Sequence, residues 1–203
     1  NWLKANQPDI WAKTEKFIFL SGYLTHKLTG EFVDSISSQV GYIPFDYKRL
    51  TWEESWDVKW QVAPVEPHKL PHLVAPSEQM GTLSASAAQA LGLTQGLPVI
   101  AAAADKACEV LGAGCTRNDQ ACLSFGTSAT INVTHSKYVE PQKFVPPFPA
   151  ALKKHYTSEV QIYRGFWMVS WFKQEFAHLE RQQATVLGIA VEQQLDDLIK
   201  NIP

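Results

Sequence analysis

The sequence lacks both an excess of positive charge and a long apolar stretch. Its 203 residues include 18 Lys and Arg against 20 Asp and Glu, which gives a formal net charge of −2. Proteins that bind nucleic acid or anionic membranes electrostatically carry basic patches or basic amphipathic helices, and the sequence has no such pattern. The longest apolar run, residues 97–104, is too short to cross a bilayer. We therefore expect no nucleic-acid partner and no membrane partner.

Cysteine is also scarce. Cys108, Cys115 and Cys122 are an odd number with no close pair, so no disulfide framework is expected. Their even spacing could suggest a metal site, but each lies among small apolar residues, and we interpret all three as small hydrophobic side chains. No residue is therefore assigned to a metal. Because no signal peptide opens the chain, these features favour a reducing, cytoplasmic compartment.

The two ends of the sequence do not have the composition of natural termini. The chain opens at Asn1-Trp2 without an initiator Met, and it closes at Ile202-Pro203 directly after an amphipathic stretch. We therefore expect an internal piece of a longer protein. Hydrophobic residues at 45% and charged residues at 19% are typical of a globular protein with a real core.

Residues 1–94 show short elements separated by helix breakers. Pro8 suits the first turn of a helix, and residues 17–20 suit a short strand. Ser21 is a candidate N-cap for a helix that Gly30 ends. A further helix is predicted over Ser84–Leu91, closed by a glycine.

Tryptophans are frequent in the middle of this first half. Thr51–Glu54 has the pattern of a capping box, and Trp52, Trp56 and Trp60 recur at intervals of four. Such a stripe could bind a sugar or a partner helix, but it more often forms the core face of a helix, which is the interpretation we favour. Prolines make residues 64–76 irregular, so two histidines four apart there are interpreted as loop residues.

The second half begins after a boundary near residues 93–96. We predict a buried strand over residues 97–104 that ends at Asp105, where a helix begins. A β-hairpin is predicted beside this strand over residues 121–134, with Gly126-Thr127-Ser128 at its turn. The remaining predicted elements are a helix end at Gly112 and Gly114, a proline-rich loop at 141–149, a strand at 160–163, and helices at 172–179 and 191–199.

Asp105 is the strongest candidate for chemistry. A strand that ends in an acid at the start of a helix is a common active-site arrangement in α/β proteins. The helix dipole favours the ionised carboxylate, and a positioned carboxylate can accept a proton from an alcohol. Position alone favours catalysis and simple helix capping equally.

The Gly126-Thr127-Ser128 turn is a candidate phosphate site. It lacks the length and the lysine of a P-loop, but a tight glycine turn can present backbone N–H groups to a phosphate, and two hydroxyls can help. Taken alone, the turn is better interpreted as an ordinary hairpin turn.

In this order and context, the acid-tipped strand, the glycine-closed helix and the hairpin resemble the FGGY family of carbohydrate kinases. Ala104-Asp105-Lys106 is similar to the family's Gly-Asp-Gln or Gly-Asp-Asn motif, and Gly126-Thr127-Ser128 to its Gly-Thr-Ser or Gly-Thr-Gly hairpin. The resemblance runs from about Trp2 to about Phe176. It also includes Tyr23–Glu31 (the "YL-x-x-x-LTGE" helix end), Gly41–Asp46 with Trp52, and Arg164–Trp167 with Trp171.

The resemblance implies an α/β, ribonuclease H-like fold of the actin and hexokinase type of ATPase, as a partial two-domain fragment. Residues 1–94 would be the C-terminal part of the family's N-terminal domain, and residues 95–203 the N-terminal part of its C-terminal domain. ATP and Mg²⁺ are the implied cofactors, and a sugar or polyol is the implied partner. A homodimer of the full-length protein is compatible with the resemblance. The family's phosphate loop and its adenosine-binding segment are not among these residues.

Two departures from the family pattern concern the substrate. Lys106 stands where relatives carry an amide that helps to hold the sugar, so it either contacts an acidic or phosphorylated substrate or turns outward, which we slightly favour. Residues 34–39 lack the tyrosine that contacts substrate in glycerol kinases. This difference argues against glycerol and leaves the sugar unassigned.

Two functions from different classes remain. The first is a carbohydrate kinase in which Asp105 is the catalytic base, Gly126, Thr127 and Ser128 bind the nucleotide phosphates, and Lys106 is a tentative substrate contact. The chain alone would be inactive, because part of the phosphate grip is absent. The second is a non-catalytic, nucleotide-binding regulatory member of the same superfamily, which Lys106 keeps open. A sugar-binding module that uses the tryptophans is weaker, because it gives Asp105 no role.

Overall fold

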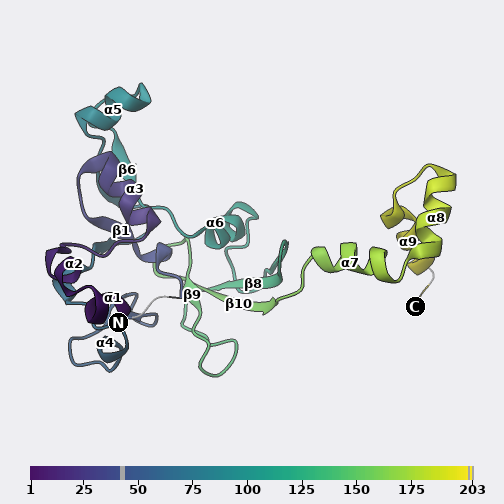
Figure 1. Cartoon of the computed structure of the whole chain (residues 1–203), viewed down its shortest axis with the longest axis horizontal. Helices are drawn as coiled ribbons and strands as arrows, with labels where there is room; N and C mark the ends of the chain where they lie inside the picture. The colour runs from purple at the N-terminus through teal and green to yellow at the C-terminus, as the bar shows by residue number, and fades with distance from the viewer. Residues whose placement is uncertain (42–43, 201, 203) are drawn as a thin grey trace. The chain divides into compact units, whose positions relative to one another are not determined.

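A computed structural model of the chain describes residues 1–41, 44–200 and 202. It is an α/β structure that separates into two compact units (Figure 1). The first unit contains Asn1–Cys122 and Asn132–Glu159, and the second contains Leu123–Ile131 and Val160–Pro203. We describe each unit by itself. Tyr42 and Ile43, which belong to the family-like segment Gly41–Asp46, lie outside the described residues.

Short elements make up the first unit up to the start of the long sheet. Its helices are α1 (Trp2–Asn6), α2 (Pro8–Lys13), α3 (Leu20–Thr29), α4 (Lys59–Val62), α5 (Ala85–Leu91) and α6 (Asp105–Gly112), with 3₁₀ turns η1 (Ile36–Ser38) and η2 (Pro67–Lys69). Its early strands are β1 (Val33–Ser35), β2 (Phe45–Asp46), β3 (Thr51–Trp52), β4 (His72–Val74), β5 (Gln79–Thr82) and β6 (Pro98–Ile100).

Four later strands form the longest sheet, in the order β7-β8-β10-β9. These strands are β7 (Cys122–Phe125), β8 (Ala129–His135), β9 (Phe148–Pro149) and β10 (Tyr156–Ile162). The other pairings are two-stranded: β1 with β4 in parallel, and β2 with β3 and β5 with β6 antiparallel. The predicted hairpin is thereby confirmed as β7 and β8, which are neighbours in the sheet.

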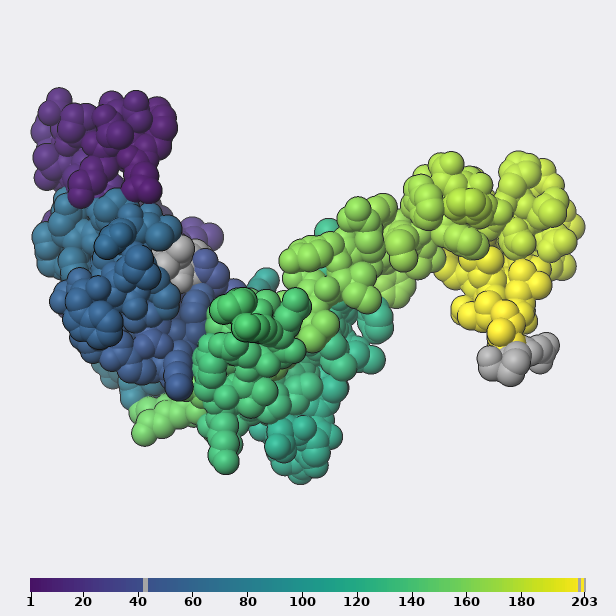
Figure 2. Space-filling model, turned by 90° about the horizontal axis from the view of Figure 1, so that it is seen from below, coloured from purple at the N-terminus to yellow at the C-terminus, as the bar shows by residue number. Residues whose placement is uncertain are grey.

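Three helices follow in the second unit: α7 (Trp167–Glu175), α8 (His178–Leu187) and α9 (Val191–Ile199). They form the yellow-green to yellow surface in Figure 2. The predicted helix at 191–199 is confirmed, but the one predicted over 172–179 is wrong, because Phe176 and Ala177 separate α7 from α8. Phe176 leaves the helix with its ring packed against Trp171 and Phe172.

Two glycine-terminated helices are confirmed. Gly30 follows α3 and Gly92 follows α5, both in the left-handed conformation that ends helices without a Cβ penalty. The Ser84 hydroxyl caps α5 by accepting from the Ala87 N–H. The start of α3 differs from the prediction. The helix begins at Leu20, so the strand over 17–20 is wrong, and the Ser21 hydroxyl donates to Asp34 instead of capping the helix.

The capping box at Thr51–Glu54 is wrong, because Thr51 and Trp52 form β3 and pair with β2. The acid of the box, Glu54, accepts from the Arg49 guanidinium at 2.7 Å, so it does not close a helix start. The Trp52 indole donates to the Pro71 carbonyl at 2.9 Å. Trp56 is 81% exposed. The tryptophan stripe therefore does not form a helical core face.

The strand predicted over 97–104 is shorter and less buried than expected. Only Pro98–Ile100 are in β6, and Leu97 and Ile100 are exposed. Because β6 belongs to a two-stranded ribbon with β5, no further strand among the described residues covers its open edge, and Leu97 and Ile100 are left exposed. The hairpin is not beside it, since β7 and β8 belong to the other sheet.

The three cysteines are free and differ in exposure. Cys122 is buried, Cys115 is intermediate, and Cys108 on α6 is exposed. The interpretation of all three as small hydrophobic side chains fits the buried Cys122 best and the exposed Cys108 least. Burial raises the pKa of the Cys122 thiol.

Candidate functional site

Asp105 is the first residue of α6, directly after the N-cap residue Ala104. An acidic residue in the first turn interacts favourably with the positive end of the helix dipole. One carboxylate oxygen, Oδ1, accepts from the Lys106 N–H at 2.7 Å. Within the described part of the chain, the other oxygen, Oδ2, has no hydrogen-bond partner. The side chain thus satisfies one helix N–H and still has an oxygen that can accept a proton.

A buried polar network fixes the backbone that leads to Asp105. The Ser37 carbonyl accepts from the Ala104 N–H at 2.9 Å. The Ser35 hydroxyl donates to the Ala102 carbonyl at 2.6 Å. Behind these serines Asp34, 1% exposed, accepts from the Ser35 N–H at 2.7 Å. Burial raises the pKa of Asp34. The segment 34–37 therefore holds the start of α6 in place.

A cavity of about 150 Å³ opens beside Asp105, all of it within the first unit. Polar side chains from α6, β8 and β10 meet apolar ones in its wall. Its lining residues are Val40, Ala104, Asp105, Lys106, Ala107, Asn132, Phe148, Pro149, Thr157 and Glu159. Apolar walls with a few convergent polar groups are typical of small-molecule sites.

Lys106 lines the same cavity, but its ammonium is already engaged. Its Nζ lies 2.6 Å from Glu109 Oε2, one turn further along α6. Across the cavity, burial raises the pKa of the Glu159 carboxyl, with Glu109 adding to this shift and Lys106 opposing it. The structure thus brings two of the predicted site residues, Asp105 and Lys106, into one cavity.

The Gly126-Thr127-Ser128 turn lies in the second unit. The Gly126 N–H donates to the Ser128 carbonyl at 2.9 Å, which closes the turn. The Thr127 and Ser128 hydroxyls have no hydrogen-bond partner in the part of the chain that the structure describes. A Cβ on Gly126 would meet no atom within 4 Å, so the space beside the turn is open. These groups can approach a phosphate closely.

Gly165 clamps this turn from behind. Its N–H donates to the Thr127 carbonyl at 2.9 Å, and the Phe166 N–H donates to the Gly126 carbonyl at 3.0 Å. A Cβ on Gly165 would lie 2.0 Å from the Gly126 oxygen, which no side chain can tolerate. The Phe125 and Phe166 rings pack edge to face at 5.8 Å. The hairpin is held by main-chain contacts that require a glycine at position 165.

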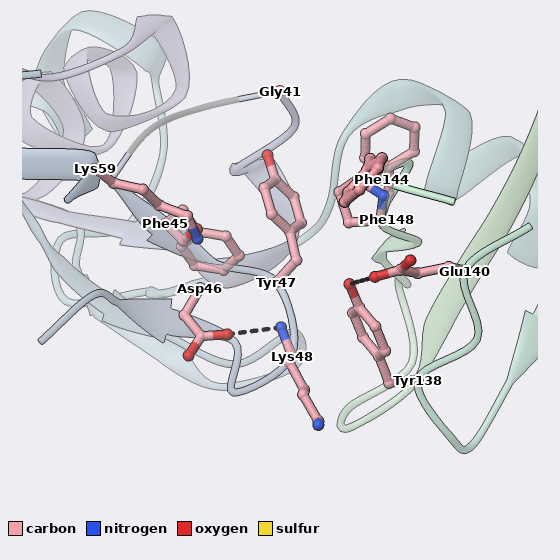
Figure 3. Close-up of a pocket in the computed structure, with 11 residues that line it drawn as sticks. Gly41, Phe45, Asp46, Tyr47, Lys48, Lys59, Tyr138, Glu140, Phe144 and Phe148 are labelled. Carbon is pink, nitrogen blue, oxygen red and sulfur yellow. Dashed lines mark hydrogen bonds between the residues drawn. The ribbon is translucent and has the colours of Figure 1, made fainter. Parts of the chain in front are cut away.

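A second, larger cavity of about 430 Å³ lies in the first unit (Figure 3). Figure 3 shows Phe45 and Tyr47 on one wall, facing Tyr138, Phe144 and Phe148 on the other. The Tyr138 hydroxyl donates to Glu140 at 3.0 Å, and burial, reinforced by this bond, raises the pKa of Tyr138 to about 12. Aromatic faces with a few polar groups suit the binding of a ring.

This aromatic cleft has one residue in common with the Asp105 cavity. Phe148 lines both, and it does so from β9, next to β10 in the sheet. None of the tryptophans that the sequence suggested for sugar binding lines either cavity.

Sequence reasoning missed three cavity residues, Asn132, Thr157 and Glu159. The available signal was the alternation of strands, because residues two apart on β10 share one face. It also missed the role of Gly165, although this glycine lies in a family-like turn. A common site for Asp105 and the Gly126–Ser128 turn stays a prediction, because the two belong to separately described units.

No metal centre can be assigned. Over residues 1–41, 44–200 and 202, no three His, Cys, Asp or Glu side chains gather where they could hold a metal ion. We therefore assign no described residue to Mg²⁺. The same described residues contain no helix with the length and apolar character needed to cross a membrane.

Solved structures share this fold. The crystal structure of a xylulose kinase from Rhodospirillum rubrum superposes with a TM-score of 0.83 at 23% identity, covering all of this chain and 39% of the other. The predicted fold class is thereby confirmed as α/β of the actin and hexokinase type of ATPase.

Sequence comparisons identify the family. The model of the N-terminal domain of the FGGY family of carbohydrate kinases matches residues 1–112. "Uncharacterized sugar kinase YgcE" of Escherichia coli K12 is 30% identical over 184 residues, 90% of this chain and 37% of the relative. The L-fuculokinase of the same strain is 35% identical over 126 residues, 62% of this chain and 26% of the relative. The chain belongs to the FGGY family of carbohydrate kinases and spans 26% to 37% of these two relatives' length.

Proposed function

We propose that the protein containing this chain transfers the γ-phosphoryl group of ATP to a hydroxyl of a sugar or polyol. The observation that carries this proposal is the Asp105 carboxylate, which lines a small cavity and keeps Oδ2 uncommitted. Family membership adds support, since the family consists of carbohydrate kinases. ATP and the sugar are then the small-molecule partners.

Asp105 acts as the general base. Its carboxylate takes the proton of the substrate hydroxyl while the hydroxyl oxygen forms a bond to the γ-phosphorus and the bond to the ADP oxygen breaks. Because a phosphoryl transfer depends mainly on positioning and charge stabilisation, the base must be held firmly. The bonds from segment 34–37 to Ala102 and Ala104 supply that support.

The Gly126-Thr127-Ser128 turn binds the nucleotide phosphates. The open space beside Gly126 and the two hydroxyls support this role. Mg²⁺ neutralises phosphate charge in enzymes of this kind, and we assign no residue of this chain to it. Residues 1–94 would complete a first domain and residues 95–203 would begin a second, with the cytoplasm as the expected location.

A phosphotransfer assay tests the proposal. The full-length protein is incubated with ATP and a panel of ketoses, aldoses and polyols, and ADP release is measured with and without each acceptor. We expect acceptor-dependent ADP release with at least one sugar. Nucleotide binding without any acceptor-dependent turnover would support the regulatory alternative instead.

The 203-residue chain alone provides a second test. We propose that it is close to inert as a kinase, because the family's phosphate loop and adenosine segment are not among its residues. Sugar phosphorylation by the purified chain would show that the catalytic parts have been misplaced.

A further inference from the structure

The wall of the Asp105 cavity contributed by β10 has no role in the mechanism above. Thr157 and Glu159 are two residues apart on this strand, so their side chains lie on the same face. Both line the cavity, opposite the Asp105 and Lys106 side chains of α6. Neither side chain makes a hydrogen bond or an ion pair with another described residue.

The Thr157 hydroxyl is buried without a described hydrogen-bond partner. The residue is 3% exposed, and its Oγ1 has no hydrogen-bond partner among the residues that the structure describes. An unsatisfied buried hydroxyl costs about 1–3 kcal/mol, so such groups normally have a protein, water or ligand partner. Here the group lines a cavity, which is where a ligand can supply the partner.

Glu159 adds a second group in need of a partner. Its carboxyl makes no hydrogen bond or ion pair with any described residue, and it is partly buried. A ligand hydroxyl satisfies both groups, because it can donate to the carboxylate and also accept from the threonine hydroxyl.

The charges of the cavity select between hydroxyl-bearing ligands. Two acids, Asp105 and Glu159, line it, whereas the ammonium of Lys106 is already paired with Glu109. A ligand carboxylate would be repelled, and like-charge repulsion is an effective way to reject a competitor. The volume of about 150 Å³ is also well below the roughly 300–1,000 Å³ of sites for drug-sized ligands.

We infer that Thr157 and Glu159 form the hydroxyl-recognising wall of the substrate site, and that this site takes neutral sugars or polyols and rejects sugar acids. The inference rests on the proposed function for the identity of the site. It answers the question that Lys106 raised, because the lysine is held by Glu109 and is not directed to an acidic substrate.

Binding measurements test the inference separately from catalysis. Isothermal titration of the full-length protein is performed with D-xylulose, L-fuculose and xylitol as neutral ligands and with D-gluconate as the acid. We expect at least one neutral ligand to bind at least tenfold more tightly than gluconate. Equal or tighter binding of gluconate, or no binding of any neutral ligand, overturns the inference.

Two variants locate the effect. Glu159→Gln keeps the shape but removes the charge, so we expect neutral-ligand affinity to fall roughly 10- to 100-fold, the effect of a hydrogen bond to a charged group. The ratio of the affinity for neutral ligands to the affinity for gluconate should also become smaller. Thr157→Val should weaken neutral-ligand binding by about tenfold. If both variants bind neutral ligands within twofold of the wild type, the inference is wrong.

Matched control variants test whether a loss of binding comes from a general loss of folding. Thr134→Val changes another buried threonine, whose hydroxyl donates to the Cys115 carbonyl away from the Asp105 cavity. Glu175→Gln changes an exposed acid on α7. Both controls should bind like the wild type, and melting temperatures identify variants that fail to fold. Selective binding of a neutral sugar without turnover would leave this inference standing and would remove the proposed kinase activity.

Discussion

Asp105 and the Gly126-Thr127-Ser128 turn are held in place by different means. The Ser35 hydroxyl and the Ser37 main-chain carbonyl support the segment before Asp105, and the buried Asp34 carboxylate accepts from the Ser35 N–H behind them. The turn is instead gripped by main-chain N–H groups of Gly165 and Phe166. The position of Asp105 therefore depends on the polar residues around it. The position of the turn depends on residue 165 having no side chain.

This difference shows where substitutions should act. A side-chain network can lose one member and keep the others, so its failure is gradual. A backbone clamp that requires a glycine fails at once when any side chain is added, because the Gly126 oxygen occupies the position of the new Cβ.

The largest effect is expected for Asp105→Asn in the full-length protein. Asn has nearly the shape of Asp and a similar preference for helix starts, but it cannot accept the substrate proton. Turnover should fall by roughly 10²–10⁴, the usual contribution of a general base, while melting temperature and ADP affinity stay near wild type. Near-normal turnover would show that Asp105 only stabilises the helix start.

Gly165→Ala tests the clamp. The added Cβ must displace the Gly126 carbonyl and break the two bonds to the turn. We expect ADP affinity to fall by about tenfold or more, equivalent to about 1.4 kcal/mol per factor of ten. Gly112→Ala is the control, because a Cβ there would meet nothing within 4 Å. Equal ADP affinity of the two variants would contradict the clamp.

Ser37→Ala tests the network behind Asp105. Ser37 is 1% exposed, and its hydroxyl donates to the Ala150 carbonyl at 2.6 Å. Leaving this buried carbonyl unpaired should lower the free energy of unfolding by about 1–3 kcal/mol, measured by denaturant titration. The exposed Ser86→Ala should change it by less than about 0.5 kcal/mol. A Ser37 variant as stable as the Ser86 variant would mean that the bond from the Ser37 hydroxyl to Ala150 does not stabilise segment 34–37.

The smallest effect is expected for Lys106→Met. Lys106 forms a partly exposed ion pair with Glu109, and such pairs contribute about 0–1 kcal/mol. Turnover of a neutral sugar should stay within about threefold of wild type. A drop of more than tenfold, measured as kcat/KM, would place Lys106 in direct contact with the substrate.

Local signals predicted the elements that depend on neighbours in sequence. Gly30, Gly92 and Ser84 mark helix ends through local backbone chemistry, and α9 follows its apolar spacing. Signals failed where a distant partner decides. The Ser21 hydroxyl bonds Asp34 and the Glu54 carboxylate bonds Arg49, so neither side chain caps a helix as the sequence pattern suggested.

The residues of the candidate site likewise differ in whether local sequence could predict them. Asp105 was predictable because its chemistry lies in one residue at the start of one helix. Thr157 and Glu159 were not, because their relevance depends on β10 meeting α6 across a cavity. The clamp at Gly165 requires knowing that residues 126 and 165 touch, and no spacing along the chain encodes that contact.

The exposure of Cys108 gives a way to observe the site directly. It lies three residues after Asp105 on α6, while Cys115 is intermediate in exposure and Cys122 is buried. A maleimide dye should therefore attach first to α6, about one helical turn from Asp105. Its emission would report ligand entry beside Asp105 in real time, without any engineered residue and without waiting for turnover.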